Sequence, residues 1–285
     1  MKKINLFVAA TALAFSSMVS AQIKTPQPSP TASIEQMVGL TEVEIEYSRP
    51  GVKGRTIFGD LLPFGEIWRT GANSATLIEV SDDVKIGGQA VPAGQYALYT
   101  IPGAEEWTVI IHKHLENWGA GGYDKTQDLC RFMVKPTKLN DKVESFTIDF
   151  SNFTTNSANI ELKWENTMIS FLMETPTDAA VEKQIKSQLV DQPAAGTYYS
   201  AASYYLEKGE NLDKADVWID KAISQRPEAF WYVHAKAKIQ AAQGKTKEAV
   251  VTAEKSMALA KAAEDDYGYV KNNENLIKEL KAKKK

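Results

Sequence analysis

Apolar and polar residues alternate with a period of two along the first half of the chain. In TEVEIEYS (41–48), every second residue from Val43 is apolar and glutamates lie between. FTIDF (146–150) and ANIELKW (158–164) repeat the pattern. Such alternation is typical of β-strands that turn one face to a core and the other to water.

Further segments of the first half predict the rest of a β-fold. Gly87-Gly88 separates two short alternating runs, which is a strong hairpin signal. GQYALYTI (94–101) and WTVII (107–111) are more continuously apolar, which is typical of central strands, and TMISFLM (167–173) ends the series. About nine or ten short strands over residues 32–174 predict an antiparallel β-sandwich of the jelly-roll or Greek-key kind.

After Thr175-Pro176-Thr177 the apolar period changes to that of a helix. Val181, Ile185 and Leu189 would share one face of a first helix. The fold class predicted for the whole chain is therefore α+β in two parts, with the β-sandwich followed by a helical region over residues 178–285.

Small residues in this helical region recur at the tetratricopeptide period. Ala201 and Ala235 are 34 residues apart, as are Ala215 and Ala249. Ser256 stands where the period calls for alanine, and the second unit lacks the proline of the first. The region is predicted to be tetratricopeptide-like, with an ordinary bundle of helical hairpins as the alternative. Two units are fewer than a full peptide groove requires, so the helices are expected either to pack on the sandwich or to contact another chain.

The N-terminus reads as a secretory signal peptide over residues 1–21. Lys2 and Lys3 precede an apolar stretch that is too short to span a bilayer, and small residues lead to a cleavage site after Ala21. Residues 22–31 are rich in proline and polar residues and are expected to form an extended leader. The protein is thus predicted to be exported, periplasmic or secreted, with no transmembrane segment in the mature chain.

Composition narrows the classes of partner. The formal charge of −3 does not indicate the excess of basic residues that is typical of nucleic-acid-binding proteins. The single cysteine, Cys130, excludes an internal disulfide, and its alternation with Phe132 and Val134 predicts a buried, inert thiol.

The stretch GLTEVEIEYSRPGVKGRTIFGDLLPFGEIWRTGANSAT (39–76) resembles the bacterial family known as domain of unknown function 2911. VPAGQYALYTIPG (91–103) and EWTVIIHK (106–113) resemble the same family. The resemblance covers about residues 26–174 and implies an exported bacterial β-domain, in some members followed by a tetratricopeptide-like tail. It implies no activity and no catalytic residues.

Cations and aromatic side chains gather in the loops of the first half. The candidate ligand-binding residues are Arg49, Arg55, Trp68, Arg69, Asn73, Trp118 and Tyr123. Aromatic faces stack on sugars, and guanidinium groups bind carboxylate or phosphate. In the alternative interpretation the arginines hold loop carbonyls or pair with Glu66 or Asp60, while the tryptophans cover the core.

No nucleotide-binding or serine-hydrolase motif is present, and no cofactor is expected. His112 and His114 lack a third ligand, so they predict a solvated strand end and not a metal site. The sequence favours a non-enzymatic module that binds a small ligand, a glycan or a protein partner. A cell-envelope hydrolase acting on glycan or peptide, and a structural assembly component, stay open as alternatives.

Overall fold

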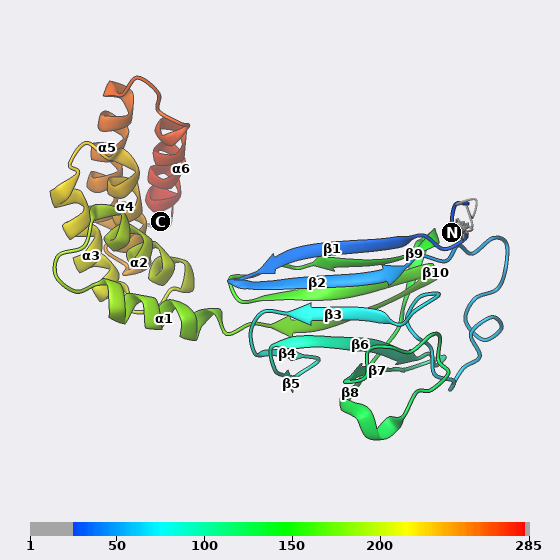
Figure 1. Cartoon of the computed structure of the whole chain (residues 1–285). Coiled ribbons are helices and arrows are strands. Elements are labelled where there is room, and N and C mark those ends of the chain that lie inside the picture. Colours follow the sequence, from blue (N-terminus) through cyan, green and yellow to red (C-terminus); the bar gives the residue numbers. More distant parts are fainter. Residues whose placement is uncertain (1–24, 283–285) are drawn as a thin grey trace, which may run out of the picture. The chain divides into compact units, whose positions relative to one another are not determined.

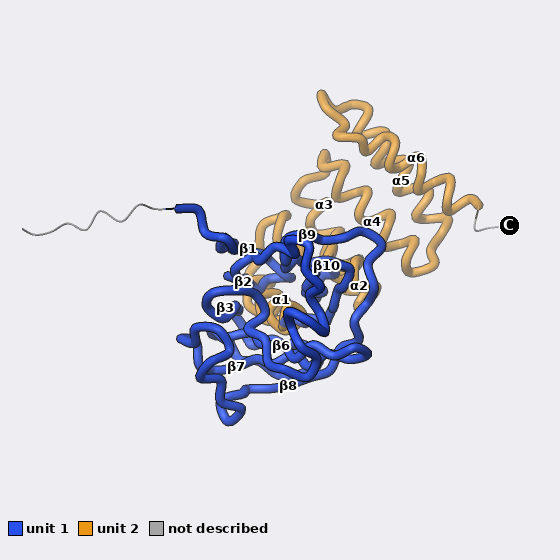
Figure 2. Tube along the Cα trace, turned by 90° about the vertical axis from the view of Figure 1, so that its right-hand side faces the viewer, with its two compact units in different colours: residues 1–175 blue, residues 176–285 orange. Residues whose placement is uncertain are grey.

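The computed structural model describes residues 25–282 of the chain, and the predicted signal peptide lies outside them. The described residues fall into two compact units that divide between Thr175 and Pro176 (Figure 2). The first unit holds all of the strands in the described part of the chain, and the second holds all of its α-helices (Figure 1).

The first unit consists of two antiparallel sheets. The strands are β1 (Thr31–Val38), β2 (Thr41–Ser48), β3 (Thr76–Val80), β4 (Val84–Ile86), β5 (Gln89–Val91), β6 (Gly94–Ile101), β7 (Trp107–His112), β8 (Asp128–Val134), β9 (Thr137–Ser151) and β10 (Ser157–Glu174). One sheet has the order β1-β2-β3-β6-β7-β8 and the other the order β5-β4-β10-β9. The predicted fold class, a β-rich part followed by a helical part, is confirmed.

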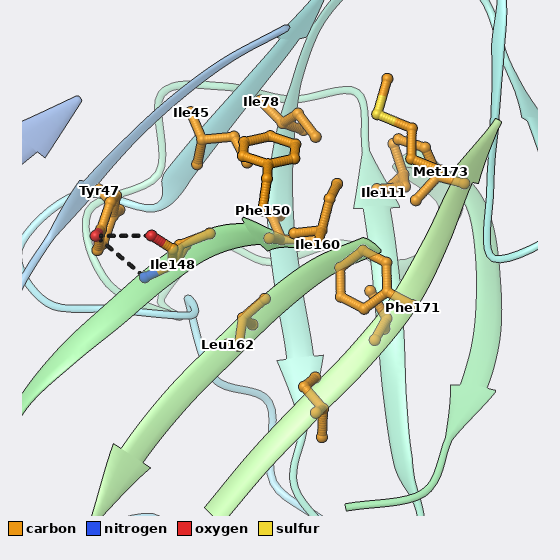
Figure 3. Close-up of a cluster of buried hydrophobic side chains, with 14 of the residues drawn as sticks. Ile45, Tyr47, Ile78, Ile111, Ile148, Phe150, Ile160, Leu162, Phe171 and Met173 are labelled. Carbon is orange, nitrogen blue, oxygen red and sulfur yellow. Dashed lines mark hydrogen bonds between the residues drawn. The ribbon is translucent and has the colours of Figure 1, made fainter. Parts of the chain in front are cut away.

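The apolar faces of the two sheets enclose one core. Ile45 and Ile78 come from the six-stranded sheet, and Phe150 and Ile160 come from the four-stranded sheet (Figure 3). The sheets are also joined by a buried phenol. The Tyr47 hydroxyl on β2 donates to the Ile148 carbonyl on β9 at 3.3 Å and accepts the Ile148 amide at 3.1 Å.

The strands β6 and β7 lie inside the six-stranded sheet and are buried on both faces. Leu98 and Ile111 face the main core, whereas Tyr99 and Ile110 pack in a second, smaller cluster on the outer face. This burial accounts for the continuous apolar runs of both segments and confirms the prediction that they are central strands.

In the second unit, each helix from the second onward packs against the next one along the chain. The helices are α1 (Thr177–Gln188), α2 (Ala195–Lys208), α3 (Leu212–Gln225), α4 (Phe230–Ala242), α5 (Thr246–Ala262) and α6 (Tyr269–Ala282). The alanines at the 34-residue period, Ala215 on α3 and Ala249 on α5, are fully buried. Small side chains at these positions let neighbouring helices approach closely, as the tetratricopeptide-like interpretation requires.

Ser256, which departs from the alanine period, anchors a buried polar network. Its hydroxyl donates to the Phe230 carbonyl at 2.8 Å and accepts from Asn273 Nδ2 at 3.0 Å. The Asn273 side-chain oxygen in turn accepts from His234 Nδ1 at 2.8 Å. The serine therefore joins α4, α5 and α6 through hydrogen bonds that an alanine could not make.

We expect Ser256→Ala to destabilise the helical unit although it restores the repeat. It leaves the buried Phe230 carbonyl and one Asn273 hydrogen without their partner, which costs about 1–3 kcal/mol. Denaturant unfolding followed by circular dichroism measures the loss, with the exposed Ser224→Ala on α3 as the control. A Ser256→Ala protein as stable as the Ser224→Ala protein would contradict the network's role.

The same network predicts a pH dependence. Burial lowers the pKa of His234 below its usual value of 6.5, against a smaller opposite effect of the Asn273 hydrogen bond. Below about pH 6.5 the unfolded chain binds a proton at His234 that the folded chain does not bind. The free energy of unfolding is therefore unaffected by this histidine above about pH 6.5 and falls as the pH drops below it. The free energy of unfolding, measured from pH 7.5 to 5, should fall less steeply in His234→Gln than in wild type.

Candidate functional site

The segment WRTGAN (68–73) lies just before β3, and its first residue pairs with β6. The Trp68 amide donates to the Thr100 carbonyl at 2.7 Å, and the Thr100 amide donates back to Trp68 at 2.9 Å. This pairing beside β6 turns the Trp68 side chain into the main core and leaves it 4% exposed. Arg69, the next residue, therefore points to the opposite face of the sheet.

Trp68 lies at the centre of an aromatic cluster that closes one end of the core. Its ring is stacked on Trp164 of β10 with centroids 5.7 Å apart, and it meets Phe146 edge-on at 5.1 Å. The indole nitrogen donates to the Gly71 carbonyl at 2.9 Å. Because this ring is enclosed, it presents no free face on which a sugar could stack.

The backbone after Trp68 is held in an unusual conformation. Gly71 has φ +156°, and a Cβ there would lie 3.0 Å from the Ser48 carbonyl oxygen. Asn73 has φ +59°, and its side-chain nitrogen donates to the Ser29 carbonyl and the Ser48 hydroxyl, both at 3.1 Å. Asn73 thus fixes the end of the predicted leader against the sheet.

Two of the candidate arginines also bind the protein itself. Arg49 donates to the Phe146 carbonyl at 3.0 Å, and Arg55 donates to the carbonyls of Val52 at 3.0 Å and Gly51 at 2.6 Å. These contacts fit the alternative interpretation, in which the arginines hold loop carbonyls.

Around this segment lies a pocket of about 360 Å³. It is lined by Pro28, Ser29, Pro50, Gly51, Lys53, Arg55, Leu61, Leu62, Trp68, Arg69, Gly71, Ala72 and Trp164. Three of these residues are cationic, namely Lys53, Arg55 and Arg69, and none is acidic. The wall of the pocket therefore carries net positive charge.

Of the three cations, Arg69 has a buried donor without a partner. Its Nε is buried without a hydrogen-bond partner, and no ion pair joins it to Glu66 or Asp60 among the described residues. Burial lowers the pKa of its guanidinium, although arginine stays charged at any physiological pH. Arg69 thus keeps hydrogen-bonding capacity that its neighbours do not use.

On the outer face of the six-stranded sheet, residues 113–127 form a strap over β6 and β7. The Ala75 amide donates to the Asn117 carbonyl at 3.2 Å, and the Gly119 amide donates to the Asn73 carbonyl at 3.0 Å. The strap ends in a short 3-10 turn, Lys125–Gln127, and β8 follows directly. Trp118 on the strap is 74% exposed, so of the candidate tryptophans it alone offers an open ring face.

Beneath the strap, Asp128 accepts from three side chains. The carboxylate is bound by His112 Nδ1 at 3.0 Å, by the Tyr123 hydroxyl at 2.9 Å and by Arg131. Arg131 also donates to the Tyr123 hydroxyl. Burial, together with the hydrogen bond to Asp128, raises the pKa of Tyr123 to about 12. Tyr123 is thus a neutral donor in this cluster.

His112 corrects one prediction. It is fully buried and paired with Asp128, so the solvated strand end predicted for it is wrong, whereas His114 is exposed. The strap is the reason, since it covers a strand end that would otherwise meet water. No group of three metal-ligating side chains occurs within residues 25–282.

Sequence reasoning also missed Asp128, Arg131, Tyr99 and Asn117. The register shift between Ile111 and His112 places Asp128 opposite the histidine. No local sequence pattern predicts this shift. Cys130 is only partly buried against the main core, less than the buried thiol expected, and burial raises the pKa of this thiol, which disfavours the reactive thiolate.

A scan of protein-family models matches residues 29–173 to the family described as "Protein of unknown function (DUF2911)". The chain belongs to the DUF2911 family. The matched span includes the positively charged pocket, apart from Pro28, and the whole strap. Searches of curated proteins and of solved structures found no match. No helix in the described part of the chain is long and apolar enough to cross a membrane.

We expect Asp128→Ala to destabilise the DUF2911 domain by about 3 kcal/mol, because it removes the common acceptor of three buried or partly buried donors. Asp128→Asn, which keeps one acceptor oxygen, should cost less. Chemical denaturation measures both, with Asp141→Ala at an exposed position of β9 as the control. Equal stability of Asp128→Ala and Asp141→Ala would show that the cluster contributes nothing to the fold.

Proposed function

We propose that the β-sandwich is an exported, non-enzymatic module that binds a small anionic ligand in the pocket beside WRTGAN. The observation that carries the proposal is the convergence of Lys53, Arg55 and Arg69 on one pocket whose lining includes no acidic residue. A volume of about 360 Å³ falls within the range of small-molecule sites.

The three cations differ in how firmly the protein holds them. Arg55 is held by backbone carbonyls, so its positive charge is fixed in place. Lys53 is exposed at the rim and free to follow a ligand, while Arg69 adds a third positive charge to the lining. Hydrogen bonds to charged groups contribute about 1.5–3 kcal/mol each. Two of them at about 2 kcal/mol each correspond to a Kd of about 1 mM.

A hydrolase is less well supported by this pocket. Glycoside hydrolysis uses a pair of carboxylates on either side of the bond that is cleaved. The lining of the pocket supplies neither member of such a pair. Cationic side chains without an acid or base favour holding an anion over cleaving a glycan.

Titration with citrate and with inorganic phosphate tests the proposal. Trp68 and Trp164 line the pocket, so we expect saturable binding in calorimetry together with a change in tryptophan fluorescence. Lys53→Gln should weaken binding about fivefold to tenfold, because it removes a charge without removing a structural contact. Added salt should weaken binding further.

The matched control is Lys138→Gln, which removes an exposed lysine from a different, largely apolar pocket. It should bind both anions as the wild type does. Saturable binding that Lys53→Gln and Lys138→Gln leave equally unchanged would place the anion elsewhere, and the lack of any binding would refute the proposal.

Export is part of the same proposal and has its own measurement. The mature chain is expected to begin at Gln22, after cleavage behind Ala21. Intact mass of the protein recovered from the periplasm or the medium tests this, and a product that retains residues 1–21 would contradict it.

A further inference from the structure

The positively charged pocket beside WRTGAN also has apolar walls. Besides its three cations, two glycines and one serine, the lining consists of apolar side chains. They are those of Pro28, Pro50, Leu61, Leu62, Trp68, Ala72 and Trp164. A hydrated anion such as phosphate gains nothing from such walls, because they offer no hydrogen bonds. The lining therefore fits a ligand that carries a negative charge and an apolar group in one molecule.

Leu61 supplies apolar surface that a ligand can reach. Its side chain is 41% exposed, whereas Trp68 and Trp164 are 4% and 2% exposed and reach the pocket only with small parts of their surface. The backbone of the turn that carries Leu61 is fixed, since the amide of the next residue, Leu62, donates to the Ile57 carbonyl at 2.8 Å. This apolar wall is therefore in place before a ligand arrives, which lowers the entropic cost of binding.

The predicted leader supplies a second part of the apolar wall. Pro28 and Ser29 both line the pocket. The Ser29 carbonyl accepts from Asn73 Nδ2 at 3.1 Å, and the Pro30 carbonyl accepts the Arg49 amide at 2.9 Å. These bonds hold the leader at the pocket, so this wall is also preformed.

A carboxylate beside the pocket limits the charge that the ligand needs. Glu144 Oε1 accepts the Lys53 amide at 2.7 Å, and a Cβ on Gly51 would lie 3.4 Å from the same oxygen. Its negative charge offsets part of the positive charge of the three cations. Guanidinium groups bind carboxylates well, and we therefore expect one carboxylate at this wall and not a multiply charged group.

We propose that the ligand of this pocket is a small apolar carboxylate. Its charged end lies among Lys53, Arg55 and Arg69, and its hydrocarbon group lies against Leu61 and Pro28. The inference rests on the anion-binding function proposed above and narrows that function to one chemical class. It accounts for the presence of cationic and apolar side chains in a single pocket.

Phenylacetate is the probe, and two compounds are its matched comparisons. Acetate keeps the charge and lacks the ring, while phenylacetamide keeps the ring and lacks the charge. In calorimetry we expect phenylacetate to bind at least about tenfold more tightly than acetate, because its ring removes apolar surface from water. Phenylacetamide should bind about tenfold more weakly than phenylacetate, because it cannot pair with the cations.

Leu61→Ala should weaken phenylacetate binding about threefold to tenfold and leave phosphate binding unchanged, because it removes only apolar surface. The control is Leu172→Ala, which truncates a leucine that is 44% exposed on β10 and lies outside the lining. It should bind phenylacetate as the wild type does. Lys53→Gln should weaken the binding of phenylacetate and of phosphate alike. Thermal melts establish that the variants fold.

The proposed function and this inference can fail separately. If citrate, phosphate and phenylacetate all fail to bind, the anion-binding function is wrong and the inference falls with it. If citrate or phosphate binds while phenylacetate binds no more tightly than acetate, only the inference is overturned. Equal affinities for phenylacetate and phenylacetamide, or equal effects of Leu61→Ala and Leu172→Ala, would also overturn it.

Discussion

The stacked pair of Trp68 and Trp164 is the contact on which the architecture of the β-sandwich domain depends. Trp68 belongs to a loop beside the six-stranded sheet and Trp164 to the four-stranded sheet, so their burial joins the two layers. With the indole fixed inside, side-chain alternation turns Arg69 outward. The positively charged pocket is lined by both indoles and by Arg69. Loss of the Trp68 indole would therefore disturb the pocket and the core together, and could not be interpreted as a loss of binding alone.

The outer face of the six-stranded sheet is partly buried as well. A sheet in a sandwich normally leaves one face to water, yet Tyr99, Ile110 and His112 are buried there because the strap covers them. Burying polar side chains is costly unless their partners are supplied, and Asp128 supplies them for Tyr123 and for one side of the imidazole. The other side of the imidazole has no partner in the protein.

The helical unit also buries polar side chains, and those around Ser256 are paired with one another. Ser256 replaces a small apolar residue at a fully buried position, and its hydroxyl is completely used by Phe230 and Asn273. A buried polar network whose members are all paired stabilises one arrangement of α4, α5 and α6.

The sequence by itself determined the two-part α+β fold, the central strands and the alanine positions of the helical repeat, because periodicity depends on residues that are neighbours along the chain. It also singled out Arg69 and Tyr123, through the concentration of cations and aromatic residues in the loops. Only the tertiary structure decided that Trp68 is buried, that Arg49 and Arg55 hold loop carbonyls, and that His112 meets Asp128. Those outcomes depend on strand register, on a register shift between β7 and β8 and on the path of the strap, which bring together residues far apart in the sequence.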